Sequence, residues 1–149
     1  MTQFEILQII TGFLGSLGFA VLFNIRGKKL IFATLAGFLS WMLFVLLKFV
    51  TESEPLRYFI VAILVSVYAE IMARVLKTPT TTFHMTALIP LIPGGSLYYT
   101  MSSVFDGDLG HFIEKGIYTL ELAVALALGI VLVTAVARTV GRRKRLKGR

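Results

Sequence analysis

The stretch Leu88–Tyr99 reads LIPLIPGGSLYY, and it places two prolines and two adjacent glycines inside an otherwise apolar run. Proline removes a backbone donor and obstructs the preceding helical turn, while paired glycines let the backbone leave helical dihedral angles easily. A segment this apolar is expected to avoid water, yet its backbone is interrupted where an interruption is costly. The composition of the chain indicates what surrounds this segment.

The composition is typical of an integral membrane protein. The 149 residues are 56% hydrophobic and 15% charged, with a mean hydropathy of +0.83, which is more apolar side chain than one soluble core would bury. The first apolar stretch lacks a basic n-region and a small-residue cleavage site, so we expect a retained span and not a cleaved leader. The chain contains no cysteine, which excludes disulfides and cysteine-based metal or redox chemistry.

The predicted fold is an all-α integral membrane protein with five transmembrane helices, of which the fourth is broken at Pro90–Gly95. Each apolar stretch is close to the roughly 20 residues that a helix needs to cross about 30 Å of hydrocarbon. The segments between the stretches combine charged residues with proline, glycine or hydroxyl residues, as loops do. The predicted spans in this single domain, 1–149, are residues 4–23, 30–47, 58–76, 83–105 and 116–137.

The distribution of lysine and arginine predicts the orientation. If residues 83–105 cross the membrane, the basic loop at 26–29 shares one face with Arg74, Lys77 and the basic tail at 138–149. The opposite face then carries only three basic residues: Lys48, Arg57 and Lys115. This asymmetry follows the positive-inside rule and places the N-terminus outside and the C-terminus in the cytoplasm. A re-entrant segment would remove the asymmetry.

The net charge of +7 does not indicate nucleic-acid binding, because much of it lies in the tail at 138–149 without an aromatic or groove-reading element. We interpret the tail as a cytoplasmic topology anchor that also contacts anionic lipid headgroups.

The interrupted segment predicts two half-helices. Pro90 and Pro93 each leave the carbonyl four residues earlier without its usual partner, while Gly94 and Gly95 allow the chain to turn away from the helix. Ser96 is then expected to cap the second half-helix. We expect the two halves to meet near the middle of the bilayer.

An open backbone at that depth is tolerated only inside protein or beside a wet cavity, since each unpaired group costs several kcal/mol in lipid. Many transporters build a substrate site from such discontinuous helices, with a half-helix N-terminus facing an anionic group. The backbone N–H groups of residues 94–97 would therefore suit a carboxylate. A proline kink required only for packing remains the alternative.

Glu70 and Arg74 are one helical turn apart in the third span, so they share a face and can form an ion pair. Ionisable residues inside a span are costly and should face the protein interior. Glu70 could exchange protons, and Arg74 could bind a substrate carboxylate through its planar guanidinium group. Alternatively, Arg74 extends to the cytoplasmic interface and Glu70 only neutralises it. Glu121 in the last span is a weaker candidate.

The other polar residues are weaker indications of function. His84 is interpreted as an interfacial polar residue. No metal site is expected in the loop after residue 105, because its ligand-type side chains match no known ligand pattern; these are Asp106, Asp108, His111 and Glu114. Small residues four apart in the first two spans predict close helix packing in a tight bundle or an oligomer; these are Gly12, Ser16, Ala20, Ala33 and Gly37.

The residues from Glu70 to Tyr98 resemble a known family. The pattern Glu70-x-x-Ala-Arg, Lys77-x-Pro, Phe83 and then IPLIPGG-x-LY from Ile89, in a short five-span chain, is similar to the smaller, C-terminal-type domain of the threonine/serine exporter (ThrE) family. The similarity is closest to the separate small, YjjB-like subunit of two-component members. The first two spans and the last match only in hydrophobic pattern.

The resemblance implies an exporter subunit in the bacterial cytoplasmic (inner) membrane. Its partner would be a larger, YjjP-like ThrE subunit, and the pair would export small carboxylate metabolites such as threonine, serine or the dicarboxylate succinate, driven by proton exchange. Glu70 and Arg74 would form the ionic gate or coupling site. The residues expected to bind or surround the substrate are Pro90, Pro93, Gly94, Gly95, Ser96 and Tyr98.

Two rival classes remain. The chain could be a scaffold or regulatory subunit whose partner holds the whole transport site. A membrane enzyme is not expected, because the sequence has no Gly-x-Ser-Gly or His-Glu-x-x-His signature, and Asp106-Gly-Asp108 lacks the other residues of a phospho-alcohol transferase motif. No cofactor is expected.

Overall fold

The computed structural model describes the backbone of residues 3–147, and the side chains of that range except those of residues 4 and 141–147. Within these limits the chain is helical and contains no strand. In order, the elements are α1 (Gln3–Leu22), α2 (Lys28–Leu47), α3 (Glu54–Val75), α4 (Thr81–Leu88), the short 3-10 helix η1 (Ile89–Leu91), α5 (Gly94–Phe105) and α6 (Leu109–Lys147).

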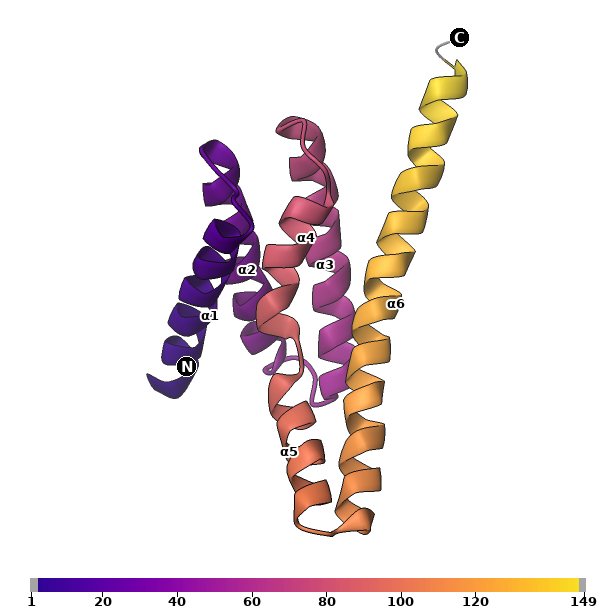
Figure 1. Ribbon diagram of the computed structural model, residues 1–149. Helices are drawn as coiled ribbons and strands as arrows, with labels where there is room; N and C mark the ends of the chain where they lie inside the picture. The colour runs from indigo at the N-terminus through magenta and orange to yellow at the C-terminus, as the bar shows by residue number, and fades with distance from the viewer. Residues whose placement is uncertain (1–2, 148–149) are drawn as a thin grey trace.

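The first three helices run alternately up and down, and the run α4–η1–α5 then descends beside them (Figure 1). Helix α6 returns along α5 and α3, so it runs in the same direction as α1 and α3 (Figure 1). Helix α5 and the first part of α6 form a hairpin that extends beyond the ends of α1, α2 and α3 (Figure 1).

Four helices are long and apolar enough to cross a membrane: α1, α2, α3 and α6. The first two lie within two residues of the predicted spans. The α4–η1–α5 run does not meet that criterion, because its longest helix has only 12 residues. The finding is therefore a multi-pass helical membrane protein with four candidate spans, and the fifth crossing and the orientation stay predictions.

Two helices begin earlier than the predicted spans, and one of them also ends later. Helix α3 begins at Glu54, four residues before the predicted Tyr58, because Pro55 lies in the first turn, where no backbone donor is needed. Helix α6 begins at Leu109 and not at residue 116, because the Asp108 side chain accepts the N–H of His111 at 3.0 Å and caps the first turn. The helix also continues through most of the predicted tail, to Lys147.

Close packing of small residues holds α1, α2 and α4 together. A Cβ atom built on Gly37 of α2 would lie 1.8 Å from Ser16 Oγ of α1 and 3.0 Å from the Thr86 carbonyl oxygen of α4. Ala20 and Ala33 are fully buried in the same interface region. The predicted small-residue packing between the first two spans is thus confirmed, and it extends to α4.

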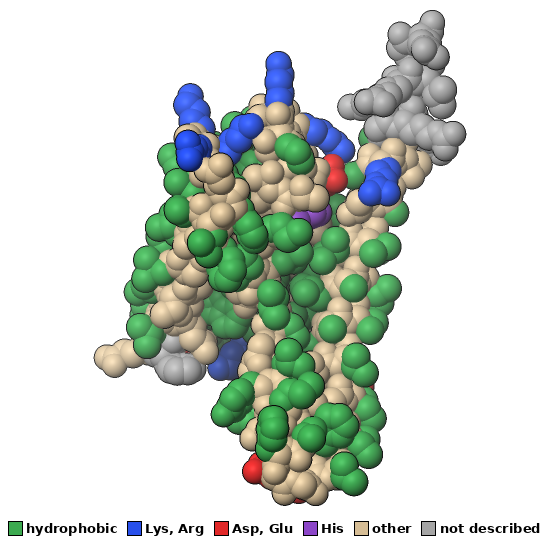
Figure 2. Space-filling view, viewed as in Figure 1, with side chains coloured by type: hydrophobic (Ala, Val, Ile, Leu, Met, Phe, Trp, Pro, Cys, Tyr) green, Lys and Arg blue, Asp and Glu red, His purple; other side chains and the backbone are tan. Residues whose placement is uncertain are grey.

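Basic side chains gather at the end of the bundle that holds the α1–α2 and α3–α4 connections (Figure 2). Exposed residues there include Arg26, Lys28, Arg74 and Lys77. The predicted separation of basic residues between the two ends is therefore present in the fold, and it favours that end as the cytoplasmic one.

Candidate functional site

The predicted break in the fourth segment is confirmed. The chain leaves the α-helix at Leu88, makes one 3-10 turn and becomes extended at Ile92, whose ψ is 124°. Pro93 precedes the first residue of α5, which is Gly94. The expectation that Ser96 caps this helix is wrong: Ser96 lies inside the first turn, and the N-cap Pro93 makes no side-chain hydrogen bond.

Two backbone donors remain open at the start of α5. The N–H of Gly94 donates to the Ile92 carbonyl at 2.6 Å, and the N–H of Leu97 donates to the Pro93 carbonyl at 3.0 Å. Among the described residues, no backbone acceptor faces the N–H groups of Gly95 and Ser96. The sequence suggested four available donors, and the geometry leaves these two at the positive end of a 12-residue helix.

The break lies nearer one end of the bundle than its middle. Leu91 is fully buried in a cluster with Phe44, three residues before the end of α2, and Tyr58, four residues after the start of α3. The interruption is therefore about one helical turn from the α2–α3 connection. Its depth in a membrane stays a prediction: the same cluster also includes Leu122, near the middle of the apolar portion of α6.

Two of the predicted substrate-binding residues line different hollows. Pro90 lines a hollow of about 280 Å³ against α1 and α2, together with Gln8, Thr11 and Trp41. Ser96 lines another, of about 430 Å³, between α5 and α6.

The remaining predicted residues are largely exposed around these hollows. Gly94 and Gly95 are exposed, and no neighbour lies within 4 Å of a Cβ built on either. Tyr98 is 69% exposed and lines neither hollow, while its ring contacts that of Tyr99, which does line the α5–α6 hollow. The neighbouring tyrosine is thus better placed than Tyr98 for the cavity-shaping role predicted from the sequence.

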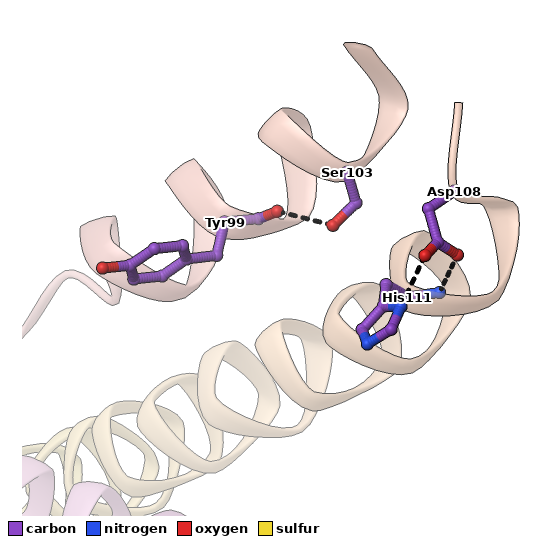
Figure 3. Close-up of polar contacts among 4 residues, drawn as sticks. All are labelled: Tyr99, Ser103, Asp108 and His111. Carbon is purple, nitrogen blue, oxygen red and sulfur yellow. Dashed lines mark hydrogen bonds and ion pairs between the residues drawn. The ribbon is translucent and has the colours of Figure 1, made fainter. Parts of the chain in front are cut away.

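Hydroxyl side chains make up most of the lining of the hollow between α5 and α6, including those of Ser96, Ser102 and Ser103. Outside that lining, Thr100 and Thr119 share a hydrogen bond of 3.1 Å that joins the two helices. Nearer the loop, Ser103 donates to the Tyr99 carbonyl, and Asp108 contacts His111 through both carboxylate oxygens (Figure 3).

The Asp108 contacts have an electrostatic consequence. The hydrogen bond from the His111 backbone, and then the one from its ring, lower the pKa of Asp108 below its ordinary value. The contact is therefore a helix cap. Within residues 3–140, no three ligand-type side chains converge as a metal ion would require.

Glu70 and Arg74 form the predicted ion pair, with 3.2 Å between Glu70 Oε2 and Arg74 Nη2. The Glu70 side chain is 17% exposed and that of Arg74 is 60% exposed. The pair lies far from the break, because twelve residues of α3 separate Glu70 from Tyr58, which is about 18 Å at 1.5 Å per residue. The two parts of the predicted site are therefore separate in the structure.

His84 of α4 belongs with the Glu70 pair. Its Nε2 atom is buried and has no hydrogen-bond partner among the described residues. The ring interacts electrostatically with Glu70 of α3. Sequence analysis interpreted His84 as an interfacial polar residue and did not anticipate this electrostatic interaction.

Sequence reasoning also missed a charged cluster at the opposite end of the bundle. Glu5, Lys48, Glu54 and Arg57 line a hollow of about 250 Å³ beside Trp41. They come from the ends of three helices, where single charges ordinarily indicate only an interface with water. Glu121, the weaker sequence candidate, is exposed on α6 and lies outside this cluster.

These features define a multi-pass helical membrane protein with a discontinuous helix and polar groups at both ends of its bundle. A sequence model of the family described as "Threonine/Serine exporter, ThrE" matches residues 8–136, which include the break and the Glu70 pair. The chain therefore belongs to the threonine/serine exporter family, whose members are transporters. No curated protein and no solved structure matches it.

Proposed function

We propose that this chain is the small subunit of a secondary exporter for small carboxylate metabolites, either amino acids of the threonine/serine type or dicarboxylates such as succinate. The observation that carries the proposal is the pair of open N–H groups on Gly95 and Ser96, at the positive end of a helix inside the family match. Such a pair suits a carboxylate in transit. The interrupted α4–η1–α5 run would be the fourth of five crossings.

The Glu70–Arg74 pair would act as a second, separate station at the basic, cytoplasmic end. His84 joins it there through its interaction with Glu70. A carboxylate that alternates between Arg74 and a proton could couple substrate movement to proton exchange. Because about 18 Å of helix separates this pair from the break, the substrate would meet the two stations in sequence.

We further propose that the chain works in a bacterial inner membrane with a larger YjjP-like subunit as its partner. Its basic tail would contact anionic lipids there. Exposed apolar side chains on α5, such as Phe105 at 90%, leave a face for a partner or lipid. The same exposure favours the alternative, a scaffold or regulatory subunit whose partner holds the whole transport site.

The test is efflux of radiolabelled threonine, serine and succinate from cells that make this chain alone and then with the adjacent larger membrane protein. Replacing both Pro90 and Pro93 with alanine should restore a continuous helix and lower efflux at least tenfold at equal membrane abundance. Unchanged efflux would reject the role of the break.

Glu70→Gln should abolish or uncouple export while the protein stays in the membrane, because glutamine neither titrates nor carries the charge that pairs with Arg74. Glu114→Gln, an exposed carboxylate near the start of α6, is the matched control. Normal export by Glu70→Gln would show that the coupling role is wrong. For the scaffold alternative, bulky residues at Gly94 or Gly95 should disturb assembly with the partner before they alter substrate preference.

A further inference from the structure

The hollow near the α2–α3 connection contains two buried donors without partners. Trp41 Nε1 and Arg57 Nε are both buried, and neither has a hydrogen-bond partner among the described residues. Both side chains line the hollow of about 250 Å³, many times the roughly 10–15 Å³ that one water needs. Buried donors without acceptors are rare and call for an explanation, such as a bound molecule.

The guanidinium group of Arg57 is available to bind an anion. Within the described part of the chain it makes no ion pair, and its guanidinium carbon lies 5.1 Å from the centre of the Phe44 ring. The aromatic ring fixes the position of the planar group without using its hydrogen-bond donors. A carboxylate that enters the hollow could therefore accept bonds from Arg57 and from the Trp41 indole.

The same hollow also contains carboxylates. Glu5 is buried and forms an ion pair with Lys48 at 3.1 Å, whereas Glu54 accepts a hydrogen bond from Tyr118. Glu54 is not paired with a cation among the described residues. The lining thus combines donors and a cation with an acceptor that carries a negative charge. A simple anion would satisfy only the donors and the cation.

We propose that this hollow recognises the zwitterion of a small α-amino acid, with its carboxylate on Arg57 and Trp41 and its ammonium group on Glu54. The inference rests on the proposed function, since it names where the transported solute is selected. Trp41 and Gln8 also line the hollow that Pro90 borders. The selection site is therefore continuous with the break and not part of it.

Trp41 allows a direct test, because it is the only tryptophan in the chain. The full chain in lipid nanodiscs is titrated with L-threonine while indole emission is followed. Because the ligand carboxylate would accept the Nε1–H, a saturable change in emission is expected. Three probes separate the charges: 3-hydroxybutyrate lacks the ammonium group, threoninol lacks the carboxylate, and succinate has two carboxylates. Each should bind at least tenfold more weakly than L-threonine.

Variants assign the two charges. Arg57→Gln should weaken L-threonine binding at least tenfold, and Arg57→Lys should not restore it fully, because lysine lacks the planar fork. Glu54→Gln should reduce the preference for L-threonine over 3-hydroxybutyrate. Arg26→Gln, which removes one positive charge at the other end of the bundle, should bind as the parent does. The emission spectrum without ligand checks that each variant keeps the Trp41 environment.

Three results would overturn the inference: no emission change with L-threonine, an undiminished change in Arg57→Gln, or succinate binding as tight as that of L-threonine. Failure here is distinguishable from failure of the proposed function. If export depends on Pro90 and Pro93 but L-threonine does not change Trp41 emission, the proposed export function stands and this binding site is rejected. If L-threonine changes Trp41 emission but cells that hold both subunits do not export it, the binding site stands and the proposed export function is rejected.

Discussion

Gly37 and Gly95 show two opposite uses of the same residue type. A Cβ at Gly37 would lie 1.8 Å from Ser16 Oγ, whereas a Cβ at Gly95 would meet nothing within 4 Å. The first glycine lets three helices approach closely, and the second leaves a helix N-terminus open. The comparison shows that the α1–α2–α4 interface has no room for a larger side chain, whereas the start of α5 remains accessible.

The largest effect is expected for Gly37→Ala. The added methyl group overlaps Ser16 and approaches the Thr86 carbonyl, so we expect a loss of about 3 kcal/mol or more in the free energy of unfolding. Unfolding of the purified protein in mixed micelles measures it. The double variant with Ser16→Gly should recover much of the loss, and no recovery would mean that the contact with Ser16 does not limit this interface.

Gly129→Ala should have the next largest effect. Its Cβ would lie 2.6 Å from Ala62 Cβ and 2.8 Å from the Phe59 carbonyl oxygen, where α6 packs on α3. A loss of roughly 1–3 kcal/mol is expected, because the overlap at 2.6 Å is less severe than the 1.8 Å overlap at Gly37. The same unfolding assay ranks the two variants, and a loss larger than that of Gly37→Ala would reverse the comparison.

Gly95→Ala should leave stability unchanged or raise it by up to about 1 kcal/mol, because alanine loses less backbone entropy than glycine in an exposed helix. A methyl group beside the open N–H should nevertheless lower efflux if a carboxylate approaches there. Parallel measurement of unfolding and of threonine efflux separates these effects. A stability loss close to that of Gly37→Ala would show that the start of α5 is packed.

The smallest effect is expected for Asp108→Asn. The pKa of Asp108 is lowered in the folded state by bonds from His111, so its stabilising contribution exists above the unfolded value of about 3.9 and disappears as pH falls through the lower folded value. Thermal unfolding of parent and variant between pH 7 and pH 2.5 should show the parent's advantage at neutral pH and its loss in acid. A difference independent of pH would contradict this assignment.

Sequence reasoning succeeded where the determinant is local. The break at Pro90–Gly95, the pairing of Glu70 with Arg74 and the close packing of small residues in the first two helices follow from spacing along one helix or from side-chain size. Each requires knowledge of only a few neighbouring positions. The limits of the first two helices were also recovered to within two residues.

Sequence reasoning failed where the answer depends on how the helices are aligned. Leu91 of the break shares a buried cluster with Phe44 and Tyr58, and this alignment of helices sets how far the break lies from Glu70. The unpaired donors of Trp41 and Arg57 come together from two helices. Neither residue is unusual in its own segment, so no local pattern singles it out.

The length of α6 has a consequence for the surrounding lipid. Its apolar portion, Leu109–Val140, has 32 residues and measures about 48 Å at 1.5 Å per residue, whereas hydrocarbon is about 30 Å thick. The companion helices α1 and α2, with 20 residues each, match an ordinary bilayer. Hydrophobic mismatch of this kind costs fractions of a kcal/mol per Å, so lipids with longer acyl chains should favour a steeper α6 and change how the α5–α6 hairpin stands in the membrane.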